Sequence, residues 1–297
     1  MNDRLFEKIK NVSNIKNLSG LVIALVCLNL FFIINIGKSR EQNKDGAIYF
    51  LNVGQGDSEL IWLPGGVKIL IDGGPPNKKA AIALSQILSP FDKNIDLVII
   101  SHPELDHYGG LEEVARRYEI SALISNGREA DSAAYKSLKE TLVQNQIPEI
   151  NLFKNDKIKF GSSVLKILNP DKSKAKKEKS ANETSLIIYL KNPKMTAIFT
   201  GDSGLKTEKT ILSNLPKIDV LKVGHHGSKT STGENFVKKL TPKIAVIEVG
   251  KNGYGHPRPE VVSRLEKYGA QIFRTDLDET IKITGNGKDL KVISVKQ

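Results

Sequence analysis

Four side chains with metal-binding atoms fall within six consecutive residues of this chain. The segment 101–110 reads SHPELDHYGG and contains His102, Glu104, Asp106 and His107. Imidazole and carboxylate groups together suit Zn²⁺, Mn²⁺ or Fe²⁺. In an extended loop, His102 and Glu104 point the same way. The adjacent Asp106 and His107 diverge there, so they could serve a second ion or a second face of the site.

The other histidines also fall in glycine turns that follow expected strands. His225 and His226 belong to the turn GHHGS, and His256 belongs to GYGHP. Asp202 ends another apolar run and is the natural carboxylate to bridge two ions, which would clamp the attacking and leaving oxygens of a displacement. One of His225 and His226 would complete the second ion.

An apolar run at residues 95–100 positions the first cluster. It is too short for a typical helix and rich in branched residues, which predicts a buried strand. Gly109 and Gly110 then precede a helical pattern at 111–117. The cluster therefore lies on a turn at the carboxyl end of a strand, where sites are usually built in an open α/β sheet.

From residue 46 onward, short β runs give way to alternating strands and helices, and this succession occurs loosely twice. The pattern predicts an α/β fold in which two sheets pack face to face with helices outside. Expected strands are 47–53, 60–63, 67–71, 95–100, 120–125, 157–168 as a hairpin, 185–190, 196–200, 219–223, 244–249, 271–274 and a closing hairpin. Expected helices are 79–88, 111–117, 133–144, 205–215, 236–240 and 259–268.

The composition is compatible with an anionic partner and excludes two kinds of cysteine site. The formal net charge is +11, which suits nucleic acid, anionic lipid or a phosphorylated polymer, although a lysine-rich, solvated surface accounts for it equally well. The single cysteine, Cys27, permits neither an internal disulfide nor a cysteine-based zinc site. The lysine-rich segment 171–181 is expected to be a solvated, mobile loop, with a polyanion contact as the alternative.

The N-terminus carries a candidate membrane anchor. A polar tail at 1–17 precedes an uncharged apolar segment at 18–37, which is about one bilayer crossing long. We interpret this segment as a signal anchor; the alternatives are a cleaved signal peptide and a buried core helix. The charge bias predicts a single-pass protein of the cell membrane with its main domain outside the cytoplasm. Residues 38–45 form a linker, and 46–297 form the domain.

Several motifs resemble one family. The segment SHPELDHYGG resembles the signature of the metallo-β-lactamase superfamily, His-x-His-x-Asp-His followed by glycines. More narrowly, VGQGD, IDGG, TGD, KVGHHGS, YGHP and RTD resemble, in the same order, the hydrolase domain of ComEC-type competence proteins. The resemblance covers about residues 46–290. It implies an αββα sandwich with a binuclear metal site at the edge of two sheets, and phosphodiester hydrolysis by a metal-activated water.

The sequence departs from the superfamily at two points. Glu104 stands where a second histidine is usual, and the harder oxygen ligand shifts the preference from Zn²⁺ toward Mn²⁺. No histidine lies between His107 and Asp202, where NETS at 182–185 occupies the corresponding stretch, as in the ComEC-like group. The ion held by the cluster at 102–107 would therefore have fewer nitrogen ligands than is usual in the superfamily. The sequence also has one apolar segment where a full competence protein has many, so a role in DNA uptake does not follow automatically.

These observations give one hypothesis, a membrane-anchored hydrolase of phosphodiesters, with DNA as the substrate and two divalent ions, Mn²⁺ or Zn²⁺. The alternatives are a phosphocholine-type or small-molecule phosphodiesterase and a non-catalytic DNA-binding module. The expected metal ligands are His102, Glu104, Asp106, His107, Asp202 and His225 or His226.

Further residues receive supporting roles in this hypothesis. Asp106 would also orient the attacking water, while His256 or the spare histidine, such as His226, would donate a proton to the leaving oxygen or hold a phosphate. The expected ligand-orienting groups are Asp57, Asp72, Asn182 and Ser185, with turn formation as the alternative for the two aspartates. The expected phosphate contacts are Lys222, Lys229 and Arg274, with a solvated surface as the alternative.

Overall fold

The computed structural model describes residues 46–295. The expected tail, membrane segment and linker lie outside the described residues. Within 46–295, no helix combines the length and the apolar character that a membrane crossing requires.

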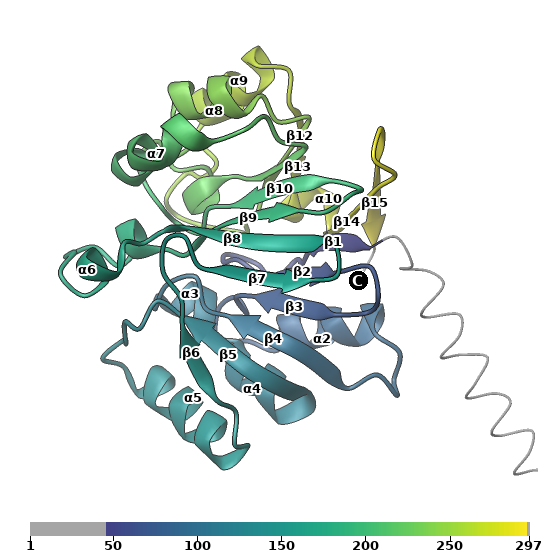
Figure 1. Ribbon diagram of the computed structural model, residues 1–297, viewed down its shortest axis with the longest axis vertical. Coiled ribbons are helices and arrows are strands. Elements are labelled where there is room, and N and C mark those ends of the chain that lie inside the picture. The colour runs from purple at the N-terminus through teal and green to yellow at the C-terminus, as the bar shows by residue number, and fades with distance from the viewer. Residues whose placement is uncertain (1–45, 296–297) are drawn as a thin grey trace, which may run out of the picture. The chain divides into compact units, whose positions relative to one another are not determined.

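In the described part of the chain, fifteen strands form two sheets (Figure 1). The first has the order β15-β14-β1-β2-β3-β4-β5-β6 and the second β13-β12-β11-β10-β9-β8-β7. The strands of the first sheet are β1 (Ala47–Phe50), β2 (Glu59–Trp62), β3 (Lys68–Ile71), β4 (Asn94–Ile99), β5 (Glu119–Ser125), β6 (Glu149–Asn151), β14 (Thr280–Gly285) and β15 (Leu290–Val295). Those of the second are β7 (Lys157–Phe160), β8 (Ser163–Asn169), β9 (Ile187–Lys191), β10 (Thr196–Phe199), β11 (Val220–Lys222), β12 (Ile244–Ile247) and β13 (Gln271–Arg274).

Each sheet has an antiparallel part and a parallel part. In the first, β15, β14, β1, β2 and β3 pair antiparallel, and β3 to β6 pair parallel. In the second, β7 to β10 pair antiparallel, and β10 to β13 pair parallel. Parallel neighbours end at the same edge of a sheet, so the loops that follow β3, β4, β10 and β11 can meet there.

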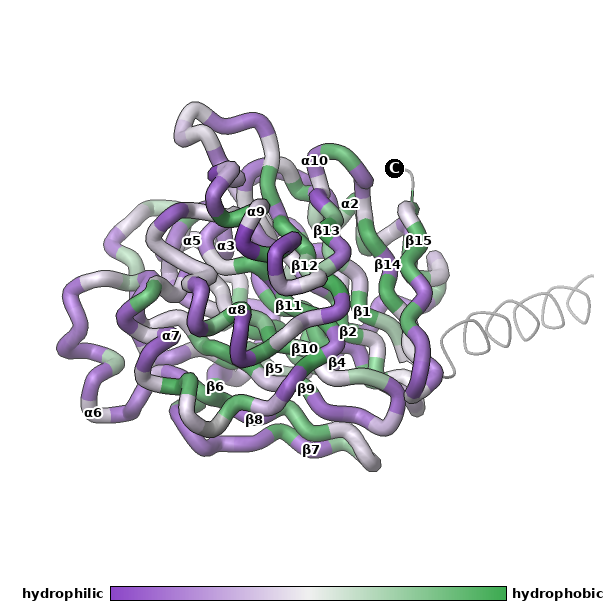
Figure 2. Tube along the Cα trace, turned by 90° about the horizontal axis from the view of Figure 1, so that it is seen from above, coloured by the Kyte–Doolittle hydropathy of each residue, from purple (hydrophilic) through white to green (hydrophobic). Residues whose placement is uncertain are grey.

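Side-chain alternation along the strands builds three apolar layers. On β1, Ile48 and Phe50 face the other sheet, where the rings of Phe50 and Phe199 stack with centroids 6.1 Å apart. Ala47 and Tyr49 face the opposite way, into the layer that packs under the helices. Apolar residues accordingly concentrate along the strands and polar ones along the outer loops (Figure 2).

Helices cover both outer faces. Those on the first sheet are α2 (Lys79–Ile87), α4 (Leu111–Arg117) and α5 (Ala133–Gln144), and those on the second are α7 (Leu205–Ile211), α8 (Glu234–Leu240) and α9 (Pro259–Lys267). Ser132 caps α5 by accepting a hydrogen bond from the Tyr135 amide at 3.1 Å, and Pro259 suits the first turn of α9. The predicted αββα sandwich is confirmed for the described residues.

Several short elements differ from the prediction. The motif 101–110 contains one helical turn, α3 (Leu105–Tyr108), where an extended loop was expected. The lysine-rich loop begins with another, α6 (Lys172–Ala175), and β6 was not predicted because its three residues are polar or exposed. The remaining short elements are α10 (Thr275–Asp278) and the 3₁₀ turns η1 (Asn182–Thr184), η2 (Leu212–Asn214) and η3 (Gly224–Gly227).

Candidate metal centre

Four of the expected ligands converge at the shared edge of the two sheets. Asp106, His107, Asp202 and His226 each offer one ligand atom, and these atoms lie within 4.8 Å of one another. Nε2 of His226 is 3.2 Å from Oδ2 of Asp106 and 3.7 Å from Oδ2 of Asp202. Nε2 of His107 is 3.4 Å from the same Asp202 oxygen. The group is therefore compact enough to hold one ion.

The helical turn α3 explains how adjacent residues share this group. The amides of His107 and Tyr108 donate to the carbonyl of Glu104 at 3.0 and 3.1 Å, which winds the chain immediately after it. The prediction that Asp106 and His107 diverge was wrong, because it assumed an extended loop. Gly56 lets the turn approach β1 and β2, since a Cβ there would lie 2.3 Å from the carbonyl oxygen of Asp106.

A strained turn presents the histidine pair. His225 and His226 both have left-handed backbone conformations, with φ of 48° and 52°. Such a conformation costs a non-glycine residue about 1 kcal/mol or more. The surrounding loops support it: the His225 amide donates to Gly201 at 3.3 Å, and the Gly224 amide donates to Thr232 at 3.0 Å. Strain held in this way is typical of functional sites.

His102 and Glu104 differ in exposure: His102 lies in the core, and Glu104 faces a cleft beside the group. His102 is fully buried, and its ring centroid is 4.1 Å from that of His107. Burial and the neighbouring His107 lower the pKa of His102 to about 3, so the ring is neutral near pH 7. Glu104 is exposed and lines the cleft, where partial burial and Asp106 raise its pKa.

Buried acceptors fix the orientation of two imidazoles. Asp72 lies 2.8 Å from Nδ1 of His107, and its other oxygen accepts the amide of Ser101 at 2.8 Å. Nδ1 of His226 lies 2.8 Å from the carbonyl oxygen of Glu248. In both histidines these contacts leave Nε2 facing the group, which is the arrangement that metal-ligating histidines usually have.

The charges of the group support one another in the absence of an ion. Burial acts to lower the pKa of His226, but Asp202 and Asp57 outweigh it and raise that pKa to about 10. Burial acts to raise the pKa of Asp202, but His107 and His226 outweigh it and hold that pKa well below its usual range. A divalent cation would replace the positive charge that the two imidazoles otherwise carry.

Lys222 was predicted to contact phosphate or to lie on a solvated surface, and the structure contradicts both predictions. Its side chain is completely buried, and its ammonium pairs with Asp57 and donates to the carbonyl of Gly201 at 3.0 Å. Asp57 in turn lies 3.2 Å from Nδ1 of His226. Lys222 therefore acts behind the ligands and cannot reach a substrate in the cleft.

Two buried carboxyl groups beside this pair were missed. Glu59 and Glu248 group with Asp57, and the Ser58 amide donates to Glu248 at 3.0 Å. Burial, followed by the charge of Asp57, raises the pKa of Glu248 to about 8. A signal was present: Glu248 follows an apolar strand directly, as Asp202 nearly does, and Glu59 stands directly before the apolar run at 60–63.

A polar cleft of about 270 Å³ opens onto the group. Its lining includes the expected Glu104, Asp106, Asn182, Asp202, His225, His226 and His256, together with Gln55 and Tyr254, which were not predicted. Ser185 lies just behind, where its hydroxyl accepts the amide of Asp202 at 3.3 Å. Burial and the neighbouring His225 lower the pKa of His256.

The other two expected phosphate contacts do not line this cleft. Lys229 is exposed in the loop after η3, and Arg274 pairs with Asp276 at 2.7 Å.

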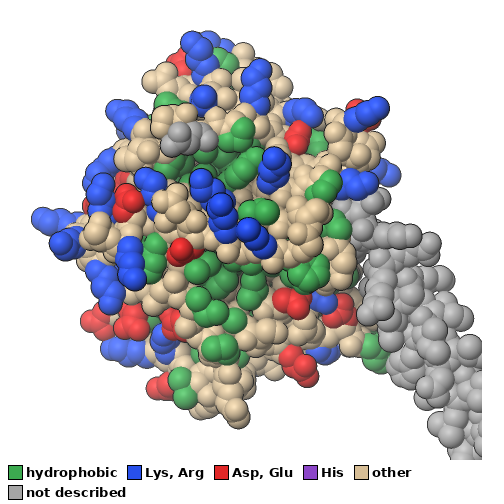
Figure 3. Space-filling view, in the orientation of Figure 1, with side chains coloured by type: hydrophobic (Ala, Val, Ile, Leu, Met, Phe, Trp, Pro, Cys, Tyr) green, Lys and Arg blue, Asp and Glu red, His purple; other side chains and the backbone are tan. Residues whose placement is uncertain are grey.

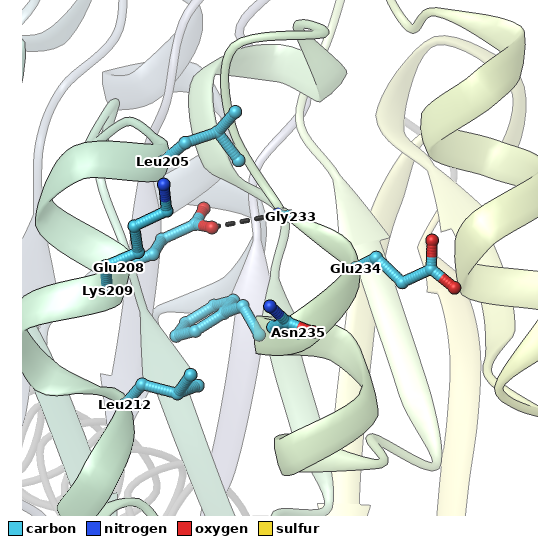
Figure 4. A pocket seen from close by; sticks show the side chains of 8 residues that line it. Leu205, Glu208, Lys209, Leu212, Gly233, Glu234 and Asn235 are labelled. Carbon is cyan, nitrogen blue, oxygen red and sulfur yellow. Dashed lines mark hydrogen bonds between the residues drawn. The ribbon is translucent and has the colours of Figure 1, made fainter.

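A second hollow, of about 330 Å³ between α7 and α8, lacks such convergence (Figure 4). Its buried carboxylate, Glu208, accepts the amide of Gly233 at 2.8 Å and that of Thr232. These bonds tie the start of α8 to α7, so we interpret Glu208 as a structural residue.

Comparison with known proteins confirms the resemblance predicted from the motifs. Residues 51–250 match the family described as the Metallo-beta-lactamase superfamily. The chain is 30% identical over 289 residues to ComE operon protein 3 of Bacillus subtilis (strain 168), covering 90% of this chain and 36% of that protein. It is 25% identical over 245 residues to Competence protein ComA of Neisseria gonorrhoeae, covering 80% of this chain and 32% of that protein.

The chain thus spans about a third of the length of these relatives. Among solved structures, it is similar to Igni18, a metallo hydrolase from the archaeon Ignicoccus hospitalis, with a TM-score of 0.54 and 18% identity. That match covers 80% of this chain and 98% of the other, and it shows the common fold.

Proposed function

The chain belongs to the metallo-beta-lactamase superfamily, and from this premise we propose that it is a metal-dependent hydrolase that cleaves phosphodiester bonds in DNA. The observation that carries the proposal is the convergence of Asp106, His107, Asp202 and His226 at the floor of a polar cleft. Imidazole and carboxylate ligands of this kind suit the ions that catalyse phosphoryl-group hydrolysis.

The residues present fit a divalent ion, and we propose two such ions, Mn²⁺ or Zn²⁺. Buried polar atoms are nearly always hydrogen-bonded. Within the described residues, Nε2 of His102, Nε2 of His107 and Oδ1 of Asp202 have no hydrogen-bond partner although all three are buried. One ion would be held by the group of four, and the other by His102 and Glu104 with Asp202 shared. Such ions supply Lewis-acid stabilisation of a phosphoryl oxygen and lower the pKa of water.

The chain's own groups would orient the reactants. Asp72 and the carbonyl of Glu248 hold the rings of His107 and His226, so that each presents Nε2. The carboxylate of Asp106 is 38% exposed and can accept a hydrogen bond from a water molecule in the cleft. His256 lines the cleft, and its lowered pKa leaves it neutral, which suits a hydrogen-bond donor to a phosphate oxygen.

Three features support DNA as the substrate. Glu104 supplies an oxygen where the superfamily usually has a second imidazole, which favours Mn²⁺. The formal net charge of +11 favours a polyanion. Relatives named ComE operon protein 3 and Competence protein ComA support a task in DNA uptake for this chain too.

The small size of the cleft favours a second candidate, hydrolysis of a small phosphodiester. A volume of about 270 Å³ lies below the usual range for ligand pockets and accommodates little more than the reacting group. This candidate uses the same ligands, and only the substrate separates it from the first.

One assay separates these functions. The purified full chain, reconstituted with Mn²⁺ or Zn²⁺, is given labelled single-stranded DNA and, separately, bis(p-nitrophenyl) phosphate. We expect cleavage of both, loss of both with a chelator, and loss of both in Asp202→Asn. Cleavage of the small diester alone would reject the nuclease, and DNA binding without any cleavage would leave a non-catalytic module.

We further propose that residues 18–37 hold the chain at the cell membrane with the hydrolase domain outside the cytoplasm. The length and uncharged character of that segment support this location. Protease added to intact spheroplasts should then degrade the domain. Protection until the membrane is permeabilised would place the domain on the cytoplasmic side.

A further inference from the structure

Five lysines occupy the segment from Lys172 to Lys179, whose first four residues form α6. All five are exposed, and Lys and Arg side chains gather at this side of the molecule (Figure 3). We call Lys176, Lys177 and Lys179 the lysine ridge.

The backbone of the ridge is anchored although its side chains are solvated. The guanidinium of Arg128 donates to the carbonyls of Ala175 and Lys179, at 3.4 Å each, and to that of Glu178. The side chain of Ala175 is buried. Three carbonyls held by one guanidinium fix the path of the chain, so the ridge lysines project from a defined support.

The nearby acids are already engaged. Glu178 pairs with Lys206 at 2.6 Å, and Asp171 lies 3.6 Å from Lys154 and 3.9 Å from Lys174. In the part of the chain that the structure describes, no ion pair involves a ridge lysine. Three ammonium groups are therefore available to an external anion.

The ridge leads directly to the candidate metal centre. Lys179 precedes Asn182 by three residues, a separation of at most about 11 Å along the chain. Asn182 lines the cleft, and its carbonyl accepts the hydroxyl of Ser185, which itself accepts the Asp202 amide. A phosphate beside the one held in the cleft would lie near Lys179, the ridge residue that is closest to Asn182 along the chain.

We propose that the lysine ridge binds the phosphates of a nucleic-acid strand next to the phosphate that is cleaved. The inference rests on the proposed hydrolase function and deepens it. Because the lysine ridge lies outside the small cleft, it would bind a polymer more tightly than a small diester. The narrow cleft favours a single strand, whose backbone can enter it while neighbouring phosphates remain on the ridge.

The test compares two triple variants of the full chain. One carries Lys176→Ala, Lys177→Ala and Lys179→Ala. The matched control carries Lys238→Ala, Lys239→Ala and Lys288→Ala, three exposed lysines that do not line the cleft. Both are assayed on a single-stranded oligonucleotide and on bis(p-nitrophenyl) phosphate. Oligonucleotide binding is also measured by anisotropy, with chelator, across a salt series.

We expect kcat/KM of the ridge variant on the oligonucleotide to fall about tenfold. The slope of log K for oligonucleotide binding against log salt concentration should decrease in magnitude by about 2, since each of three phosphate contacts contributes about 0.7. Hydrolysis of the small diester should be unchanged, and the control variant should resemble the wild type. Lys→Arg at the three ridge positions keeps the charge and should retain binding.

Three results would overturn the proposal. One is an unchanged salt slope in the ridge variant, and another is an equal loss in the control variant. The third comes from a vesicle-binding assay of the same variants. If the ridge variant is retained less on phosphatidylglycerol vesicles but cleaves the oligonucleotide like the wild type, the ridge binds a lipid surface. If the wild type cleaves no DNA at all, the proposed nuclease fails, whereas the anisotropy arm still decides whether the ridge binds DNA.

Discussion

The ring of His226 is held by the backbone of Glu248, with Nδ1 of the imidazole 2.8 Å from the carbonyl oxygen. A carbonyl only accepts hydrogen bonds, so Nδ1 carries a proton and Nε2 faces Asp106 at 3.2 Å. His225, the preceding residue, has a side chain that is 32% exposed and lines the cleft. The sequence left open which histidine of the pair binds metal, and this difference favours His226.

Alanine substitution at each histidine should therefore give different losses. His226→Ala removes a ligand from the group of four and should lower the bound metal by about one equivalent, since ligand groups set the affinity of such sites. His225→Ala should keep the metal and lower kcat/KM instead. Elemental analysis of the purified variants, with the wild type in parallel, measures this. Equal metal contents in the two variants would contradict the assignment.

Lys222 should be required for stability. Lys222→Met leaves the buried carboxylate of Asp57 without its ammonium partner, and breaking a buried pair in this way costs about 3–5 kcal/mol. Lys229→Met is the surface control and should change the free energy of unfolding by less than about 0.5 kcal/mol. Urea unfolding measures both.

The double variant Asp57→Asn/Lys222→Met provides a further control for this pair. It removes both charges and should recover part of the loss, because no uncompensated buried charge remains. If Lys222→Met unfolds like the wild type but raises KM, the lysine contacts substrate and the buried position is wrong.

Glu208 should make the protein less stable as the pH rises. Burial raises its pKa to about 7, despite the two amides that donate to it. The folded state thus binds the proton more tightly than the unfolded state, whose pKa is near 4.5, and stability falls between these values. The contribution is at most about 3 kcal/mol. Glu208→Gln cannot titrate and should flatten the wild-type curve between pH 4.5 and 7 in urea unfolding; an identical slope in both proteins would contradict this.

The sequence was sufficient to predict the layers of the fold and to name four candidate ligands that the structure brings together. Buried parallel strands appear as apolar runs, and their carboxyl ends meet at one edge, so Asp72, His102 and Asp202 could be placed together before any coordinates. The glycine turns beside them gave a second, local signal.

Lys222 and α3 could not be predicted in the same way. A lysine in an apolar run is ordinarily a surface residue, and the partner that permits its burial, Asp57, is 165 positions away. The convergence of Asp106 and His107 depends on a single helical turn, whose few hydrogen bonds leave no periodic pattern in the sequence. The hydrophobic pattern of the sequence therefore predicts neither long-range ion pairs nor helices of a single turn.

Glu104 should set the metal preference. It is an exposed carboxylate in the cleft, two residues from His102, where an imidazole would provide the softer ligand that Zn²⁺ accepts readily. Glu104→His should raise the affinity for Zn²⁺ relative to Mn²⁺ by about tenfold or more. Glu104→Gln, which removes the charge without adding nitrogen, should weaken binding of both ions. Competitive titration with a metal-sensitive dye measures the ratio. If neither variant changes it, Glu104 is not a ligand, and the preference for Mn²⁺ loses its physical basis.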